Sequence, residues 1–141
     1  MKQGFDDLYG YNFIEIARKV NVLTNKELEH LDITFPQYRV VSQLWLEGEL
    51  TQKDLHEYLT LAPATLTPII KLLEKKNWIT RNVDENDGRA KKIKLTETGI
   101  EVRNKAFEVI MKIENQLFRQ LPKEENQLFL KWLKELNKGI Q

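Results

Sequence analysis

The stretch WITRNVDENDGRAKKIKLTETG, residues 78–99, decides how the chain folds. On both sides of residues 84–89 it alternates apolar and polar side chains, as half-buried β-strands do. The central residues, Asp-Glu-Asn-Asp-Gly-Arg, form turns readily, and Gly88 can adopt positive φ. The stretch therefore predicts a β-hairpin with strands at 78–83 and 92–95 and with basic residues at its tip and arms.

The residues before the hairpin are helical in pattern. Thr34 with Gln37 and Thr51 with Asp54 each have the form of a capping box, in which the hydroxyl accepts an N–H three residues on and the later side chain bonds back. The first box predicts a helix that ends near Gly48. The apolar residues that this helix is expected to bury are Tyr38, Val41, Leu44 and Trp45.

The second capping box opens a short helix that ends near Leu59, and a turn at 60–63 leads to another helical stretch reaching Lys76. Two short helices joined by a tight turn, the second followed by basic residues, indicate a helix-turn-helix. At 100° per residue the second helix has an apolar side and an opposite side, with Thr67 at the margin. The apolar side holds Leu66, Ile69, Ile70 and Leu73, and the opposite side holds Ala64, Pro68, Lys71 and Lys75.

Both ends of the chain carry long amphipathic segments, at 5–31 and at 98–141. Their apolar stripes are wider than one small domain usually covers, so we expect a partner chain to cover part of them. No run approaches the roughly 18 apolar residues of a membrane span. The N-terminal residues do not resemble a signal peptide, because two acids stand where an apolar run is needed. We therefore expect a soluble, cytoplasmic protein.

Composition excludes several kinds of chemistry. The chain has 141 residues, the length of one domain, and 41% hydrophobic and 30% charged residues indicate a folded globular protein. It contains no cysteine, which excludes disulfides, thiolate metal sites and thiol redox switches. The two histidines, His30 and His56, have no ligand spacing for a metal. No phosphate-binding glycine loop or catalytic constellation is present, so we expect neither an enzyme nor a cofactor.

The net charge of +1 hides an uneven distribution. Residues 1–50 contain five Lys and Arg against eight Asp and Glu, whereas residues 71–95 contain eight against four. A basic stretch in a nearly neutral chain is typical of a nucleic-acid contact surface. An ordinary solvated face has the same composition, so charge alone leaves both interpretations open.

The hairpin also carries a specific motif. Asp87, Arg89, Ile93, Leu95-Thr96 and Gly99 follow the run D-x-R-x-x-x-[VI]-x-L-T-x-x-G and resemble the wing of the MarR family, bacterial transcriptional regulators built as winged helix-turn-helix dimers. Three upstream stretches match that family in register: residues 50–55, 65–67 and 72–76.

The sequence Thr65-Leu66-Thr67-Pro68 most resembles that of the organic-hydroperoxide regulators, one branch of the family. That branch senses oxidants through a cysteine near its N-terminus. This chain lacks that residue.

The resemblance implies a mainly α fold with a small β-hairpin wing, a winged helix-turn-helix flanked by N- and C-terminal dimerisation helices. We expect a single domain, 1–141, in which 34–97 form the DNA-binding lobe and 5–31 and 98–141 the dimerisation helices. Two starts can be predicted for the second helix of the helix-turn-helix. Propensity favours Thr67 as N-cap with Pro68 at the first helical position, whereas the family implies a start near Pro63, which we adopt.

The resemblance also gives a functional interpretation of the basic surface. The outer face of the second helix enters a major groove, and Arg89 enters an A·T-rich minor groove while Asp87 holds it. Lys91, Lys92 and Arg81 contact phosphates. The N–H groups that follow Thr51 hold another phosphate, although Thr51 and Gln52 can equally be simple caps. The predicted DNA contacts are Thr51, Gln52, Pro63, Ala64, Thr65, Thr67, Pro68, Lys71, Arg81, Asp87, Arg89, Lys91 and Lys92.

The sequence therefore predicts a regulator, a repressor in the first instance, that binds double-stranded DNA as a homodimer on a pseudo-palindromic operator and is released by a small aromatic or acidic effector. Five aromatic residues could line the effector pocket or simply form core: Tyr9, Phe13, Phe35, Tyr38 and Trp45. The alternative is a winged-helix module that binds protein and has no specific affinity for DNA.

Overall fold

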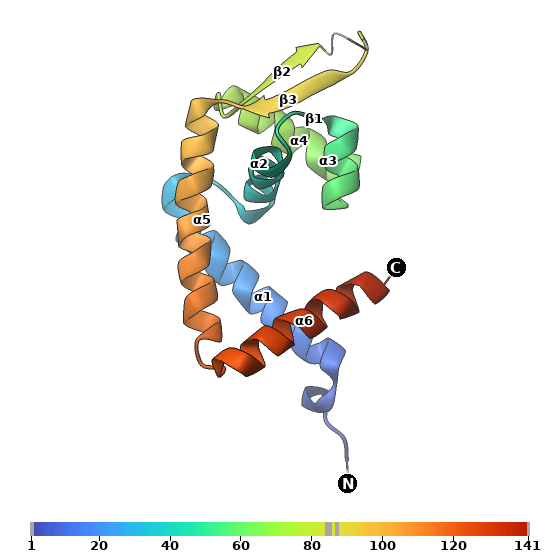
Figure 1. Cartoon of the computed structure of the whole chain (residues 1–141), viewed down its shortest axis with the longest axis vertical. Helices are drawn as coiled ribbons and strands as arrows, with labels where there is room; N and C mark the ends of the chain where they lie inside the picture. Colours follow the sequence, from blue (N-terminus) through green and yellow to red (C-terminus); the bar gives the residue numbers. More distant parts are fainter. Residues whose placement is uncertain (1, 84–85, 87, 141) are drawn as a thin grey trace. The chain divides into compact units, whose positions relative to one another are not determined.

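The computed structural model describes residues 2–83, 86 and 88–140. The chain divides into two compact units, residues 1–107 and 108–141. Figure 1 shows the elements in chain order. They are mostly helices with one small sheet, so the predicted fold class is confirmed. None of the helices that the structure describes has the length and apolar character of a membrane span.

The predicted N-terminal helical region consists of three pieces. A short 3-10 helix, Phe5–Asp7, precedes α1, Tyr9–Leu28, and a second 3-10 helix, Glu29–Leu31, follows it. Within α1 only Thr24 and Leu28 are buried. The N-terminal half of α1 thus contributes apolar side chains that the rest of its own unit does not cover.

Helix α2, Phe35–Glu47, begins and ends where its sequence signals lie. The N–H of Gln37 donates to the Thr34 hydroxyl at 3.4 Å, and the N–H of Thr34 donates to the Gln37 side chain at 3.1 Å. Gly48 ends the helix at φ 84°, a conformation that glycine adopts at little cost. The first capping box is therefore confirmed.

The helix-turn-helix consists of α3, Gln52–Leu59, and α4, Pro63–Lys75. Thr60 lies between them at φ 53°, in the left-handed region that reverses the chain. Helix α4 begins at Pro63, so the family-based start is correct and the start at Thr67 is wrong. Pro68 lies inside the helix and is tolerated on its exposed side.

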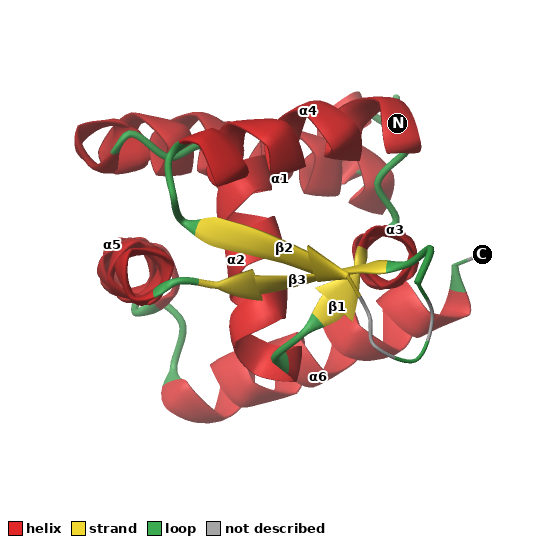
Figure 2. Ribbon diagram, turned by 90° about the horizontal axis from the view of Figure 1, so that it is seen from above, coloured by secondary structure: helices red, strands yellow, loops and turns green. Residues whose placement is uncertain are grey.

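The sheet has one strand more than the sequence predicted. Strands β2, Ile79–Val83, and β3, Lys91–Leu95, form the predicted hairpin, and β1, Leu50–Thr51, pairs with the other edge of β3. The order is β1-β3-β2, with all pairs antiparallel, as Figure 2 shows from above. A strand of two residues has no alternation to detect, which is why sequence reasoning missed β1.

The core of the first unit lies between α2, α3, α4 and the sheet. The side chains that are at most 2% exposed include Val40, Val41, Leu44, Leu55, Leu66, Ile70, Leu73, Ile79 and Ile93. Trp45 was expected in this core, and that prediction is wrong, because its side chain is 46% exposed. Its ring lies 3.8 Å from the guanidinium of Arg103, which is itself buried.

Helix α5, Glu97–Phe118, starts against the turn before β2. The Thr96 hydroxyl donates to the Asn77 carbonyl at 2.6 Å and accepts the Gly99 N–H at 3.0 Å. A Cβ on Gly99 would overlap the carbonyl oxygen of Trp78. The glycine of the wing motif is therefore required by close backbone packing.

The second unit contains the end of α5 and α6, Lys123–Gly139. Asn126 donates from its side-chain amide to the Phe118 carbonyl at 3.2 Å and so closes the connection between the two helices. No residue of α6 is buried. Its apolar side chains that are at least 38% exposed are Leu128, Phe129, Leu130, Trp132 and Leu136.

Candidate nucleic-acid interface

The two faces of α4 lie as the sequence predicted. Leu66, Ile70 and Leu73 are buried, and Ile69 is half-buried. The opposite face is exposed and carries small side chains and two lysines: Pro63, Ala64, Thr65, Pro68, Lys71 and Lys75. Small side chains let a DNA groove approach the helix backbone closely, while Lys71 and Lys75 supply positive charge.

Gln52 and Thr67, both predicted to contact DNA, contact each other. The side-chain amide of Gln52 donates to the Thr67 hydroxyl at 2.8 Å. This bond joins the start of α3 to the middle of α4. Any contact of either residue with DNA stays a prediction.

Thr51 has the capping role that was one of its two readings. Its hydroxyl accepts the N–H of Asp54 at 3.1 Å, and its own N–H donates to the Asp54 carboxylate at 2.9 Å. The second capping box is thus confirmed. The phosphate contact predicted at this helix start stays a prediction.

The wing presents the basic side chains that the sequence indicated. Arg89 and Lys91 are exposed, and Lys92 is half-buried opposite Asn82 on β2. Asp87, predicted to hold Arg89, lies outside the described residues.

The structure gives Arg81 a partner that sequence reasoning missed. Its Nε and Nη2 donate to the two carboxylate oxygens of Glu74, at 3.0 and 3.1 Å. Hydrogen bonding from Arg81 holds the pKa of Glu74 below its usual value, and the positive charge of Lys91 acts in the same direction. The same hydrogen bonds raise the pKa of Arg81. The guanidinium fork predicted to bind a phosphate is therefore held by a carboxylate of α4.

The start of α3 and the hairpin enclose a basic hollow of about 550 Å³. Eight residues from 51–53 and 81–93 line it: Thr51, Gln52, Lys53, Arg81, Arg89, Ala90, Lys91 and Ile93. Four of these side chains are cations, and none of the described residues that line the hollow is a carboxylate; Asp84, Glu85 and Asp87 lie outside the described residues. Lys53 was not predicted, because its spacing marks it only as a polar helix residue. The hollow suits an anion such as a phosphate group.

The five aromatic residues proposed for an effector pocket do not share one environment. Tyr38 is buried and stacks with Phe35 at a centroid distance of 6.1 Å, whereas Tyr9 is 85% exposed. Trp45 contacts Arg103 instead. Two hollows of the first unit, each of about 550 Å³, are lined by other described side chains, and the effector pocket stays a prediction.

A known protein family matches the part of the chain that contains most of these residues. The model of the MarR family matches residues 33–91. An organic hydroperoxide resistance transcriptional regulator of Bacillus subtilis (strain 168) is 42% identical over 82 residues, which are 58% of this chain and 56% of that protein. The transcriptional regulator SarZ of Staphylococcus aureus is 35% identical over 82 residues, with 58% and 55% covered. The match thus spans little more than half the length of these relatives.

Solved structures match over nearly the whole chain. The S. aureus MepR–DNA complex has a TM-score of 0.85 and 30% identity, covering 94% of this chain and 98% of that one. Wild-type MarR from E. coli in its apo form has a TM-score of 0.80 and 25% identity, with 92% and 96% covered.

Proposed function

Because the chain belongs to the MarR family, we propose that it is a transcriptional regulator that binds a specific site on double-stranded DNA. The observation that carries this proposal is the basic hollow between α3 and the wing, which lies in the same lobe as the exposed face of α4. A regulator of this kind works in the bacterial cytoplasm, where the chromosome lies.

In this proposal α4 is the recognition helix and enters a major groove, and the wing follows the backbone into the adjacent minor groove. Thr65 and Lys71 on the exposed side of α4 reach base edges or phosphates, and Ala64 and Pro68 contact thymine methyl groups. Lys53 and Lys91 hold a phosphate in the basic hollow, and Arg89 reaches the minor groove. Arg81 also lines the hollow; its Nε and Nη2 pair with Glu74, and we assign it to that pair in place of a phosphate.

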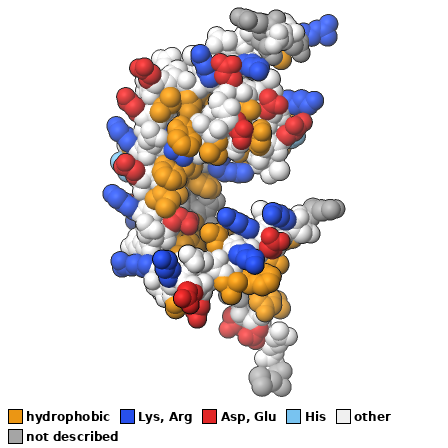
Figure 3. Space-filling model, in the orientation of Figure 1, with side chains coloured by type: hydrophobic (Ala, Val, Ile, Leu, Met, Phe, Trp, Pro, Cys, Tyr) orange, Lys and Arg blue, Asp and Glu red, His pale blue; other side chains and the backbone are white. Residues whose placement is uncertain are grey.

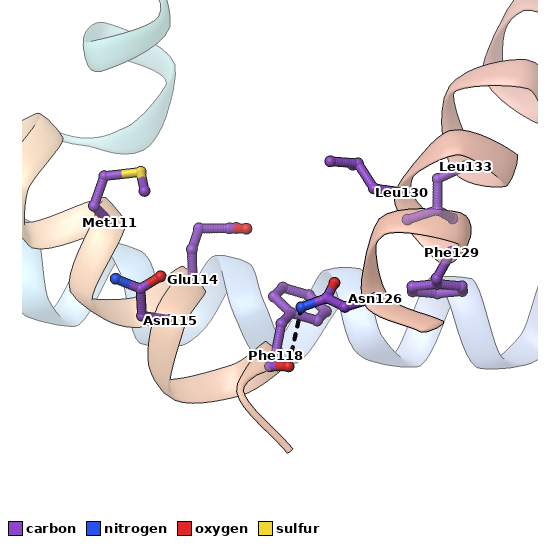
Figure 4. Close-up of a pocket in the computed structure, with 8 residues that line it drawn as sticks. All are labelled: Met111, Glu114, Asn115, Phe118, Asn126, Phe129, Leu130 and Leu133. Atoms are coloured by element: carbon purple, nitrogen blue, oxygen red, sulfur yellow. Dashed lines mark hydrogen bonds between the residues drawn. The ribbon is translucent and has the colours of Figure 1, made fainter. Parts of the chain in front are cut away.

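We further propose that two copies of the chain form a dimer through their terminal helices. A groove of about 350 Å³ lies between the end of α5 and α6, and Met111, Phe118, Phe129, Leu130 and Leu133 supply its apolar lining (Figure 4). Exposed hydrophobic side chains are also visible on the surface in Figure 3. Exposed apolar faces on helices are typical of an interface between chains.

A dimer places two α4 helices at a fixed separation. Two half-sites about 34–36 Å apart, one helical turn of DNA, then form a pseudo-palindromic operator. A repressor on such a site is released when the two lobes change their separation by a few ångström. A small aromatic or acidic effector does this if it binds the two arrangements with different affinity. The 141 residues hold no cysteine, so a thiol within them is not the sensor.

The test is selection of genomic fragments by the purified protein at about 0.15 M salt, followed by titration of the enriched duplex and a scrambled duplex of equal composition. The proposal expects the enriched duplex to bind at least about 1000-fold more tightly. Equal, weak and salt-sensitive binding of both duplexes would contradict specific DNA binding. That result would favour the alternative, a winged-helix module for a protein partner.

A further inference from the structure

The two edges of the small sheet are attached to different helices of the helix-turn-helix. On one edge, β1 runs directly into α3, and Thr51 is both the last residue of β1 and the N-cap of α3. On the other edge, β2 lies beside the C-terminal part of α4. The Gln52–Thr67 hydrogen bond joins α3 to α4. Sheet, α3 and α4 therefore form a closed ring of connections.

One connection in that ring depends on charge. The Glu74–Arg81 pair joins α4 to β2 through two hydrogen bonds, and the two side chains are 43% and 24% exposed. A guanidinium fork on a carboxylate fixes both distance and angle, which a single lysine contact does not. This pair is thus a directional link between the recognition helix and the wing.

The turn between α4 and β2 is a second link between them. Asn77 lies there at φ 60°, and the buried Trp78 donates its N–H to the Leu73 carbonyl at 3.0 Å. The buried side chains of Ile79 and Ile93 also hold the base of the hairpin in the core. Arg81 lies two residues further along β2 than Ile79, the first residue of the strand, and its pair with Glu74 adds a directional attachment to α4 at that point.

The charge of Glu74 also needs an explanation. A carboxylate beside a DNA-binding surface repels phosphates, so by itself it lowers affinity. The groups that face Glu74 are Arg81, which holds both of its oxygens, and Lys91, whose charge also acts on it. Its repulsion of DNA is thereby reduced, and what remains is its effect on geometry.

We propose that the Glu74–Arg81 pair sets the tilt of the wing against the recognition helix, so that the wing tip and the face of α4 engage one DNA duplex together. Both residues are positioning residues, and Arg81 is not a phosphate contact. The inference rests on the proposed DNA-binding function, since the tilt matters only if both elements meet the same duplex.

The test compares variants that separate charge from geometry. Glu74→Gln removes the carboxylate, Arg81→Lys keeps the charge but not the fork, and the double variant Glu74→Arg with Arg81→Glu restores the pair in reverse. Glu57→Gln, at an exposed position of α3, is the matched control for loss of one negative charge. Each is titrated against the selected operator and against a scrambled duplex.

The expected result is a loss of operator affinity of about three- to tenfold for Glu74→Gln and for Arg81→Lys, with scrambled DNA bound as well as before or better. The reversed pair recovers most of that loss, and Glu57→Gln shows none. If Glu74→Gln instead binds the operator more tightly and Arg81→Lys is unchanged, Arg81 is a phosphate contact and the inference is wrong.

A measurement without DNA keeps this inference separate from the proposed function. Ala64→Cys and Val83→Cys, both at exposed positions, place the only two thiols in the 141 residues, one on α4 and one on β2. Spin labels there report the distance between helix and wing. Glu74→Gln should broaden that distance distribution even if no DNA sequence is preferred. An unchanged distribution would contradict the positioning role.

Discussion

The winged lobe, residues 34–97, and the last helix, α6, use the same amphipathic pattern in opposite ways. In the lobe, Leu55, Leu66 and Leu73 are fully buried by neighbours from the same chain. In α6, Leu128, Trp132 and Leu136 are each more than half exposed. The lobe therefore completes its core within one chain, whereas α6 does not. Apolar periodicity therefore predicts a helix, but it does not indicate whether the same chain covers the apolar face.

The largest expected effect concerns the close packing of α5 against the backbone of Trp78. Gly99→Ala forces a Cβ onto the Trp78 carbonyl, so α5 or the wing must shift. We expect a loss of about 3 kcal/mol in the free energy of unfolding, measured in urea. Gly139→Ala in α6 is the control, since nothing lies within 4 Å of a Cβ there. Equal stability of the two variants would contradict close packing of Gly99 against the Trp78 carbonyl.

The second effect tests the open face of α6. Leu133 is half-buried and lines the groove between α5 and α6, and Leu133→Glu places a charge on that face. We expect the dimer dissociation constant to rise about 100-fold, measured by sedimentation. Gln127→Glu adds the same charge at an exposed polar position of α6 and should leave the dimer intact. An unchanged dimer for Leu133→Glu would place the interface elsewhere.

The third effect concerns the wing tip of the lobe. In the proposed complex Arg89 reaches the minor groove, so Arg89→Ala should cost about 1–3 kcal/mol of operator binding and leave both folding and dimerisation unchanged. Titration of the operator gives the affinity, and circular dichroism checks the fold. Lys19→Ala, an exposed cation on α1, should have no such effect. If both variants bind alike, the minor-groove role of Arg89 is wrong.

A smaller effect separates phosphate contacts from base contacts within the same lobe. Lys91→Ala should weaken binding to every duplex and lower the slope of log affinity against log salt by about one unit. The slope is measured by titration at several salt concentrations. A loss limited to the operator would show that Lys91 reads sequence.

The smallest effect is a pH dependence of the lobe. The pKa of Glu74 is lower in the folded chain than its usual value, so its pairing with Arg81 stabilises the fold above that usual value and is lost as pH falls through the folded pKa. Wild type should exceed Glu74→Gln in stability at about pH 7, and the difference should vanish once the pH has fallen below the lowered pKa of Glu74. A difference that persists at low pH would show that the carboxylate charge is not its source.

Local signals predicted much of the lobe. Two capping boxes, the hairpin alternation and the inner face of α4 all depend on residues a few positions apart, and all lie as expected. The exposed face of α4 follows from the same periodicity. These features need no knowledge of the rest of the chain, which is why a sequence is enough for them.

Contacts between elements could not be predicted in the same way. Arg81 and Glu74 lie seven residues apart across a junction of helix and strand, where neither period applies. Arg103 is a polar residue in a helical pattern, yet it is buried between the rings of Trp45 and Phe107. The same stack leaves Trp45 at the surface. Such pairings depend on how helices and strands pack against one another, and the periodicity within one helix or strand does not indicate that.

The most direct test of the central claim is a hydroxyl-radical footprint of the wild-type protein on its selected duplex. The account predicts an inverted repeat with two protected half-sites about 34–36 Å apart, each with an adjacent minor-groove contact that Arg89→Ala removes. One protected half-site, or uniform weak protection along the duplex, would contradict a dimeric, sequence-specific regulator.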